Sequence, residues 1–249
     1  MLFLLCNKKQ LAKHIPNFLT LLNLFCGCIA AVFAINGSMK LTAIFVFLGV
    51  FFDFFDGLLA RKLNVQSELG LQLDSLADMI TSGLVPGLVM FHLLKLAIAD
   101  FGFIPQYDSI ERGMSLLPFL GFIITLASAY RLANFNIDVN QKEGFIGLPT
   151  PANALLILSL PLILEYQNGN VIESIITNKW ILIAITLLSS YLLNAKINLI
   201  ALKFKTWSFK DNVLRYTLII LSVILLILLK FIAIPIIVLV YLILSLIKI

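Results

Sequence analysis

Long apolar runs constrain this chain more than any other feature of its sequence. The chain has 249 residues, of which 61% are hydrophobic and 12% are charged, whereas a soluble domain carries about 45–50% apolar and roughly 25% charged residues. A helix needs about 20 mostly apolar residues to cross a bilayer, and of eight candidate runs only the fifth and sixth are short. The runs are 15–36, 41–60, 72–98, 114–135, 150–166, 179–195, 212–229 and 231–248. We therefore predict an all-α, polytopic membrane helical bundle with about eight transmembrane helices, built as a single domain over residues 1–249.

Two of these runs allow more than one interpretation. The run from Ile15 to Ile35 follows three lysines, as the core of a signal peptide would, but no convincing small-residue cleavage site comes after it. We therefore expect it to remain as the first helix. Residues 212–248 are too long for a single crossing and would place Lys230 at its middle, so we predict two helices that meet at Lys230.

The basic residues are distributed unevenly between the two predicted ends of the helices. Because cytoplasmic loops carry an excess of Lys and Arg, an N-terminus in the cytoplasm explains the pattern best. The cytoplasmic set then holds 13 of the 18 basic residues: Lys8, Lys9, Lys13, Arg61, Lys62, Arg131, Lys142, Lys196, Lys203, Lys205, Lys210, Arg215 and Lys248. The outer set is Lys40, Lys95, Arg112, Lys179 and Lys230. We expect a multi-pass protein of the cell (inner) membrane.

The overall charge argues against nucleic acid as a partner. A formal net charge of +5 is small and suits a surface that faces anionic lipid. Residues 196–211 interleave lysines with Phe204, Trp207 and Phe209, a pattern typical of a segment lying on the membrane surface. We therefore expect the lipid bilayer, and no nucleic acid, as the partner of this stretch.

Four aspartates lie in or beside two apolar runs, where they are costly. An Asp at the centre of a spanning helix costs about 2.5–3.5 kcal/mol on insertion scales. Asp53 and Asp56 are separated by three positions and Asp74 and Asp78 by four, so each pair lies on one face of a helix. Polar residues between the two runs can turn the chain within residues 62–69. Two antiparallel helices would then direct four carboxylates into one cavity, at the edge of the membrane that faces the cytoplasm.

The chemistry of such a cavity favours metal ions. Four clustered carboxylates cannot all stay ionised without counter-charge, and Mg²⁺ and Mn²⁺ prefer carboxylate and phosphate oxygens. Gly57, Ala60 and Gly70 lie on the same faces and leave space for a ligand or a neighbouring helix. Arg61 adds a forked donor that suits phosphate. The alternative, in which the acids cap helix ends and pair with Arg61 and Lys62, accounts for one or two of them but not for four.

The spacing of these residues resembles a known signature. The string Asp53-x2-Asp56-Gly57-x2-Ala60-Arg61-x8-Gly70-x3-Asp74-x3-Asp78 is similar to that of the CDP-alcohol phosphatidyltransferases, and every signature position is met. The resemblance implies a helical membrane enzyme, usually a homodimer, with a site that faces the cytoplasm. It further implies that Asp53, Asp56, Asp74 and in part Asp78 hold two divalent ions. Asp78 would be the general base, and Gly57, Ala60, Arg61 and Gly70 would serve the CDP-linked lipid.

Three further segments resemble one branch of that family, the membrane-embedded phosphatidylserine synthases of bacteria and archaea. They are Pro16-Asn17-x2-Thr20-x2-Asn23-x2-Cys26-Gly27, Arg131-Leu132-Ala133-Asn134-Phe135-Asn136 and Gly147-Leu148-Pro149-x-Pro151-x2-Ala154. This resemblance implies CDP-diacylglycerol and L-serine as substrates. Arg131 suits the carboxylate of serine, although it can also be an anchor at a helix end. The family often has a second Arg where this chain has Asn134.

Other functions stay open from the sequence. The same chemistry with glycerol 3-phosphate or an inositol compound would require more cations than Arg61, Lys62 and Arg131 supply. A cation transporter is the alternative from another class, because acids within a membrane often mark ion paths. Transporters usually show repeats and sites near the middle of the membrane. In this chain the acids cluster at one edge and no internal repeat is visible.

Overall fold

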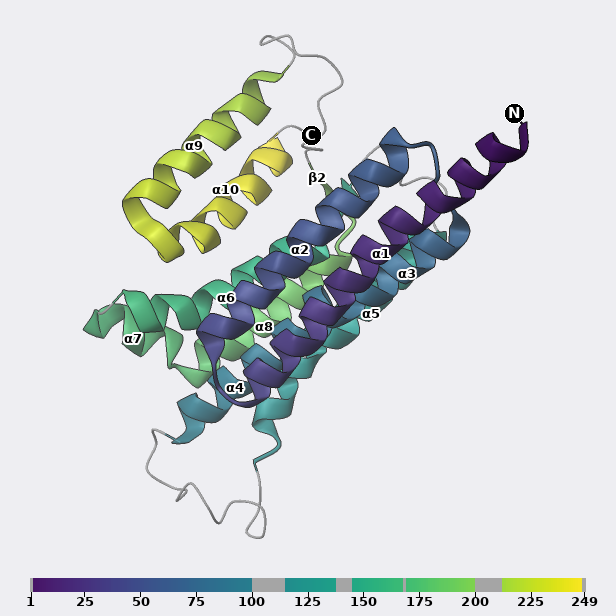
Figure 1. Cartoon of the computed structure of the whole chain (residues 1–249). Coiled ribbons are helices and arrows are strands. Elements are labelled where there is room, and N and C mark those ends of the chain that lie inside the picture. Colours follow the sequence, from purple (N-terminus) through teal and green to yellow (C-terminus); the bar gives the residue numbers. More distant parts are fainter. Residues whose placement is uncertain (1, 100–114, 138–144, 168, 200–211, 248–249) are drawn as a thin grey trace.

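The computed structural model describes residues 2–99, 115–137, 145–167, 169–199 and 212–247. Within them the chain is almost wholly helical (Figure 1). The α-helices are α1 (Leu2–Ile35), α2 (Met39–Lys62), α3 (Glu68–Asp78), α4 (Val85–Ala99), α5 (Ile123–Ile137), α6 (Thr150–Tyr166), α7 (Asn170–Ile176), α8 (Lys179–Asn194), α9 (Val213–Leu229) and α10 (Ala233–Ile247). A π-helical segment, Met79–Leu84, joins α3 to α4, and 3₁₀ turns at Leu117–Phe122 and Lys230–Ile232 precede α5 and α10.

Each predicted apolar run corresponds to a helix, which confirms the all-α membrane bundle. Five helical stretches are long and apolar enough to cross a membrane, judged by length and composition: His14–Ile35, Met39–Lys62, Glu68–Ile98, Leu117–Ile137 and Val213–Leu246. Helices α6 and α8 are shorter apolar helices. The last of the five stretches is broken, as predicted, at Lys230, where the backbone has φ of 50° and a 3₁₀ turn separates α9 from α10.

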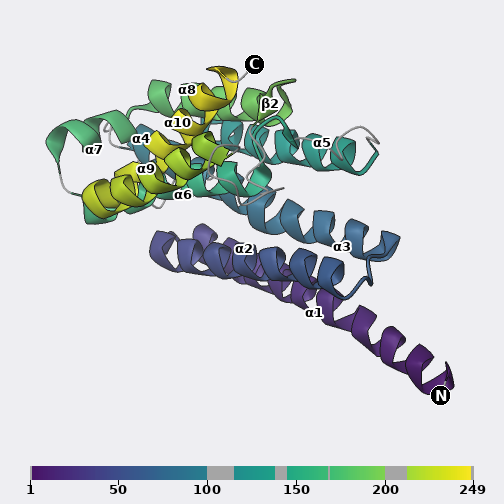
Figure 2. The same cartoon turned by 90° about the horizontal axis from the view of Figure 1, so that it is seen from above.

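The other helices pack around one long helix, which is formed by α3, the π-helical segment and α4. Helices α1 and α2 lie side by side along one flank of it, and α5, α6 and α8 lie on the other (Figure 2). Helices α9 and α10 form an antiparallel pair that contacts the bundle mainly through α6 (Figure 1). The largest buried cluster, which includes Val85, Ile124 and Ile157, lies between these groups.

Small residues allow α1 and α2 to approach the π-helical segment closely. A Cβ added at Gly49 would come 2.7 Å from Thr81 Cγ2 and 2.8 Å from Asn23 Oδ1, and one added at Gly27 would overlap Thr81 Oγ1. Helix contacts inside membranes are often made by such residues, since lipid offers no hydrophobic drive for helix association. The close approach fixes the position of Asn23 beside the long helix.

Helix α7, the strand pair and the π-helical segment were not predicted from the sequence. Helix α7 is a single short helix between α6 and α8, and Phe145–Ile146 pairs antiparallel with Asn198–Leu199 as the strands β1 and β2. After β1, Gly147 has φ of 75°, and a Cβ on it would lie 2.5 Å from the carbonyl oxygen of Leu193. The conformation and the lack of space both require glycine. This turn ties the start of α6 to the end of α8.

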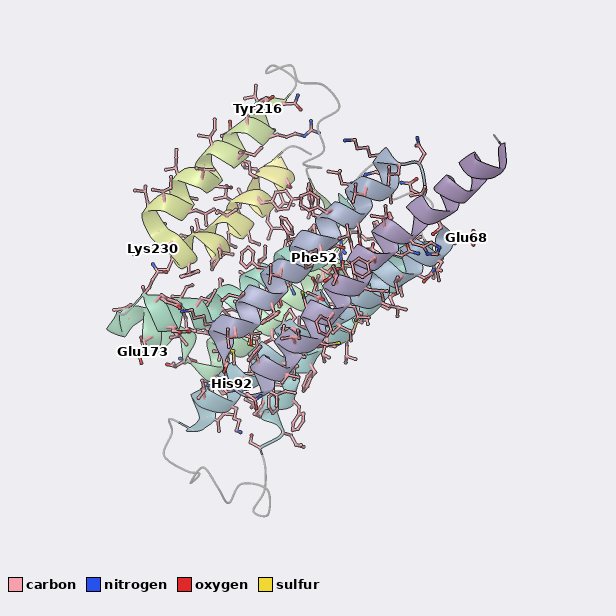
Figure 3. All side chains as sticks on the ribbon, in the orientation of Figure 1. Phe52, Glu68, His92, Glu173, Tyr216 and Lys230 are labelled. Carbon is pink, nitrogen blue, oxygen red and sulfur yellow. The ribbon has the colours of Figure 1, made fainter. Side chains whose placement is uncertain are left out.

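The two ends of the bundle differ in what they carry. Figure 3 shows Glu68 and Tyr216 towards one end, and His92, Glu173 and Lys230 towards the other. Several sequence predictions fall outside the described residues, namely Arg112, Lys142 and Lys248, most of the surface segment 196–211, the first residue of the run 114–135 and the last residue of the run 231–248. The side chains of Lys8, Lys9 and Lys13 are also outside the description.

Candidate metal and substrate site

The turn between α2 and α3 brings the two pairs of aspartates together. Helix α2 ends at Lys62, and Asn64 then adopts a left-handed conformation with φ of 52°, which Asn tolerates better than most residues. Ser67 caps α3, and its hydroxyl oxygen accepts a hydrogen bond of 3.1 Å from the Gly70 amide. The chain therefore reverses within residues 63–67, as the sequence predicted, and the two helices face each other.

Three of the four carboxylates form a compact group. Asp53, Asp56 and Asp74 each offer an oxygen, and these oxygens all lie within 4.8 Å of one another. Asp56 is buried, with 5% of its surface exposed, and the other two are half-buried. Carboxylates so close repel one another strongly in a medium of low polarity. The arrangement fits a hard divalent cation, which takes several oxygen ligands at short range.

Asp56 is held by a residue from α1. The hydroxyl of Thr20 donates a hydrogen bond of 2.5 Å to Asp56 Oδ2, and it also lies 3.1 Å from the carbonyl oxygen of Pro16. Thr20 is buried. A hydroxyl that bonds one carboxylate oxygen restricts the rotation of that carboxylate and leaves its other oxygen for a ligand.

Asp78 lies at the end of α3, where the helix widens. Its Oδ1 accepts a hydrogen bond of 3.2 Å from Asn23 Nδ2, while Asn23 itself is fully buried. The π-helical segment begins at the next residue, and such wide turns occur often at functional sites because they re-aim side chains. In that segment the Gly83 carbonyl accepts a hydrogen bond of 3.1 Å from Thr125 of α5, so the wider turn is supported by a neighbouring helix.

The small residues of the signature have different surroundings. Arg61 is exposed and its guanidinium lies over Gly57, since a Cβ added at Gly57 would meet Nη1 at 3.4 Å. The carbonyl oxygen of Ala60 accepts a hydrogen bond from the Val65 amide within the turn. A Cβ on Gly70 would meet Asn17 Oδ1 of α1 at 3.2 Å. Gly57 therefore gives room to Arg61, and Gly70 gives room for α1.

Arg131 reaches the same region from α5. Its side chain is 9% exposed, its Nε has no hydrogen-bond partner, and it lies near the oppositely charged Asp78 and near Tyr241. A buried arginine of this kind is more than a helix-end anchor, because an anchor would extend to the membrane surface. Asn134 is exposed, whereas Asn136 bonds Ser75 and Gln72 and so ties α5 to α3.

The sequence alone indicates no role for Thr20 and Asn23, although both belong to the motif that begins at Pro16. Their signal is the spacing of Pro16, Thr20, Asn23 and Gly27, which lie on one face of α1. In the structure this face meets the carboxylates and the π-helical segment. The motif therefore serves to hold Asp56 and Asp78 in position.

The residues of this site lie in the part of the chain that matches a known protein family. The family model for CDP-alcohol phosphatidyltransferase matches residues 13–192, which include all the residues described above except Tyr241. The CDP-diacylglycerol–serine O-phosphatidyltransferase of Bacillus subtilis is 31% identical over 152 residues, which cover 59% of this chain and 75% of that protein. The protein of that name from Methanocaldococcus jannaschii is 32% identical over 175 residues, covering 70% and 71%. An archaetidylserine synthase from Methanothermobacter thermautotrophicus is 31% identical over 158 residues, covering 61% and 60%.

Proposed function

The chain belongs to the CDP-alcohol phosphatidyltransferase family, and from this premise we propose that it transfers the phosphatidyl group of CDP-diacylglycerol to L-serine. The products are phosphatidylserine and CMP. The observation that carries the proposal is the group of three carboxylates within 4.8 Å, with Asp78 one turn further along α3 and a buried Arg131 beside it. A serine acceptor is supported by the names of the relatives, which are about 30% identical.

The carboxylates suit two divalent ions, Mg²⁺ or Mn²⁺. Asp53, Asp56 and Asp74 would hold them together with part of Asp78, and Thr20 would orient Asp56. When bound, such ions offset the negative charge on the attacking and leaving oxygens of a phosphoryl group. Arg61 lies exposed beside Gly57, where its forked guanidinium can bind phosphate oxygens of the CDP-linked lipid. By the family signature Gly57, Ala60 and Gly70 would also serve the CDP-linked lipid, and Gly70 in addition gives room for α1.

Asp78 is proposed to be the general base. The serine hydroxyl oxygen forms a bond to the phosphorus that carries diacylglycerol, the bond from that phosphorus to the CMP oxygen breaks, and the hydroxyl proton passes to Asp78. Asn23 occupies one oxygen of Asp78 and so turns the other towards the acceptor. Arg131 would bind the serine carboxylate through two parallel hydrogen bonds.

Two features make other functions weaker. Glycerol 3-phosphate or an inositol phosphate would bring a phosphate dianion to a wall where, in the described part of the chain, Arg131 is the buried cation. A cation transporter would need its acids along a path, whereas these acids meet at one end of α2 and α3. The family premise further leads us to propose a homodimer in the inner membrane, with the aspartates facing the cytoplasm.

One assay tests the proposed activity. Purified protein is incubated with CDP-diacylglycerol and labelled L-serine, and both CMP and labelled lipid are measured. We expect equal amounts of the two products, no turnover in excess chelator, and recovery on addition of Mg²⁺ or Mn²⁺. Full turnover in chelator would exclude the metal ions, and turnover with glycerol 3-phosphate but not with serine would replace the acceptor and leave the family chemistry in place.

A further inference from the structure

Several buried polar side chains of the bundle have atoms without a hydrogen-bond partner. Within the described residues these atoms belong to Asn23, Ser82, Ser128, Arg131, Asn153 and Ser190. Asn153 stands out because it is fully buried and neither its amide oxygen nor its amide nitrogen has a partner. An unpaired polar group inside a protein is costly, and a group with two such atoms calls for an explanation.

Three of these residues lie in one layer. Val85, Ile124 and Ile157 belong to the same buried core. On each of their helices, one turn away, is a polar residue: Ser82, Ser128 and Asn153. On the long helix Ser82 lies between the core and Asp78, and on α5 Ser128 lies between the core and Arg131. Ser82 and Ser128 are neighbours, because a Cβ on Gly83 would lie 3.2 Å from Ser128 Cβ.

Asn153 faces the same end of the bundle as Arg131. The start of α6 is bound to the end of α8, since the Leu148 amide donates a hydrogen bond of 2.9 Å to the Leu192 carbonyl oxygen. The end of α8 is bound to α5, since Asn194 Nδ2 donates a hydrogen bond of 3.0 Å to the Ala127 carbonyl oxygen. The first turn of α6 therefore stands at the level of α5 that carries Ser128 and Arg131.

Tyr241 of α10 lies near both α6 and α5. It packs in a cluster with Leu148 and with Ala152, the residue before Asn153, and it interacts electrostatically with Arg131. Tyr241 thus lies beside the first turn of α6, which carries Asn153, and near Arg131 of α5, which in turn lies near Asp78. The unpaired atoms of Ser82, Ser128, Arg131 and Asn153 therefore lie in a buried polar layer between Asp78 and the first turn of α6.

We infer that Asn153 is a specificity-determining residue that, with Arg131, binds the α-carbon end of a zwitterionic hydroxy amino acid at this buried polar layer. The inference rests on the proposed function and deepens it. A primary amide offers a donor and an acceptor together, so its nitrogen can bond a carboxylate and its oxygen an ammonium group. Arg131 supplies the charge for the carboxylate. The hydroxyls of Ser82, Ser128 and Ser190 are neutral and add no second cation for a phosphate.

Stability and binding should respond differently to a change at Asn153. If the amide had a structural role, replacing it would lower the melting temperature. With no partner in the fold, an apolar side chain of similar size removes an unpaired group and should leave the melting temperature unchanged or higher. Substrate binding should suffer instead. This opposite behaviour separates a residue that recognises the acceptor from one that supports the bundle.

The experiment compares Asn153→Leu, Asn153→Asp and wild type as full-length protein in detergent or liposomes. For Asn153→Leu we expect a KM for serine at least tenfold higher, a KM for CDP-diacylglycerol within about twofold, and no fall in melting temperature. Asn153→Asp keeps an acceptor for the ammonium group but repels the carboxylate, so it should raise the KM for serine while the KM for ethanolamine stays the same or falls. Ser159→Ala, on the same helix, is the matched control because its hydroxyl already bonds the Leu156 carbonyl.

The outcomes distinguish this inference from the function on which it rests. A wild-type protein that does not use serine overturns the proposed acceptor and the zwitterion with it. A wild-type protein that uses serine, with an unchanged serine KM in both Asn153 variants, overturns the role of Asn153 alone. Equal rises in the KM values for serine and for CDP-diacylglycerol would mean that Asn153 supports the fold. The same conclusion would follow if Asn153→Leu lowered the melting temperature and Asn153→Asp left the preference for serine over ethanolamine unaltered.

Discussion

Thr20 and Asn23 show how a membrane helix prepares carboxylates for chemistry. Each donates one hydrogen bond, to Asp56 and to Asp78 respectively, from a buried position on α1. In a medium that excludes water, a carboxylate without such a bond would rotate or become protonated. Partners of this kind orient the ligands of a metal and typically change metal affinity by 10–100-fold when removed.

Replacing Thr20 should therefore alter the metal dependence of the enzyme. Thr20→Val keeps the shape of the side chain but removes the donor to Asp56. We expect the Mg²⁺ or Mn²⁺ concentration for half-maximal activity to rise by about 10-fold or more, with Thr20→Ser close to wild type. The measurement is activity against metal concentration. Thr42→Val is the matched control, since Thr42 is also buried but bonds Ser38 at the other end of α2; an equal change in both variants would count against the role of Thr20.

Asp78 offers a test of proton transfer. Asp78→Asn preserves size but cannot accept the hydroxyl proton, and general base catalysis typically contributes 10²–10⁴-fold. We expect kcat to fall by about that factor while CDP-diacylglycerol still binds, which can be followed by protection against thermal unfolding. An Asp78→Asn protein with near-normal kcat would mean that another group takes the proton.

The candidate site was predictable from the sequence only in part. Asp53, Asp56, Asp74 and Asp78 stand out because a charge in an apolar run is costly, and their spacing assigns them to helix faces. Their hydrogen-bond partners, Thr20 and Asn23, are polar but uncharged. Placing such residues in an apolar run costs little free energy, so they do not stand out in the sequence. Asn153 gives no signal in the sequence for the same reason, although it lies within the motif from Gly147 to Ala154.

At the scale of elements, the side chain of Gln167 bonds both ends of the break between α9 and α10. Gln167 follows α6 directly. Its Nε2 donates a hydrogen bond of 2.9 Å to the Leu229 carbonyl oxygen, and its Oε1 accepts one of 3.0 Å from the Ile232 amide. These are backbone groups that the break at Lys230 leaves without helical partners. Tyr166 packs against Phe231 with ring centroids 5.4 Å apart, which adds an apolar contact at the same place.

Removing the amide of Gln167 should loosen this pair. Interhelical hydrogen bonds in membranes are worth about 0.6 kcal/mol on average and up to about 1.7 kcal/mol, so Gln167→Leu should cost about 1–3 kcal/mol. We expect a lower melting temperature and faster proteolysis at the α9–α10 turn. Gln66→Leu is the control, because Gln66 is exposed in the turn after α2. If both variants melt like wild type, the pair is held by apolar packing instead.

The sequence predicts those elements that hydropathy determines. It does not predict those that depend on contacts between residues far apart in the chain. The eight apolar runs, the turn within 62–69 and the break at Lys230 follow from the cost of burying polar groups in lipid. Helix α7, the β1–β2 pair and the π-helical segment depend on contacts between distant residues. The Gly83 carbonyl, for example, bonds Thr125, forty-two positions later in the chain, and no local pattern reports such a contact.

At the scale of the whole molecule, the two ends of the bundle differ in charge and in chemistry. The aspartates, Arg61 and Lys62 belong to one end, while His92, Glu173 and Lys230 lie towards the other (Figure 3). An enzyme that releases CMP into the compartment where nucleotides are made would expose the first end to the cytoplasm. The uneven distribution of basic residues predicts the same orientation.

Labelling of single cysteines tests this orientation. In a background with Cys6, Cys26 and Cys28 replaced, Lys62→Cys and Lys196→Cys should react with a membrane-impermeant maleimide only after cells are opened. Glu173→Cys and Lys230→Cys should react in intact cells, because these positions lie at the other end of the helices and are exposed. Each variant is first checked for activity, so that labelling reports on folded protein. The reverse pattern would place the aspartates outside the cell, where no CDP-linked lipid is made, and would contradict the orientation and the proposed function together.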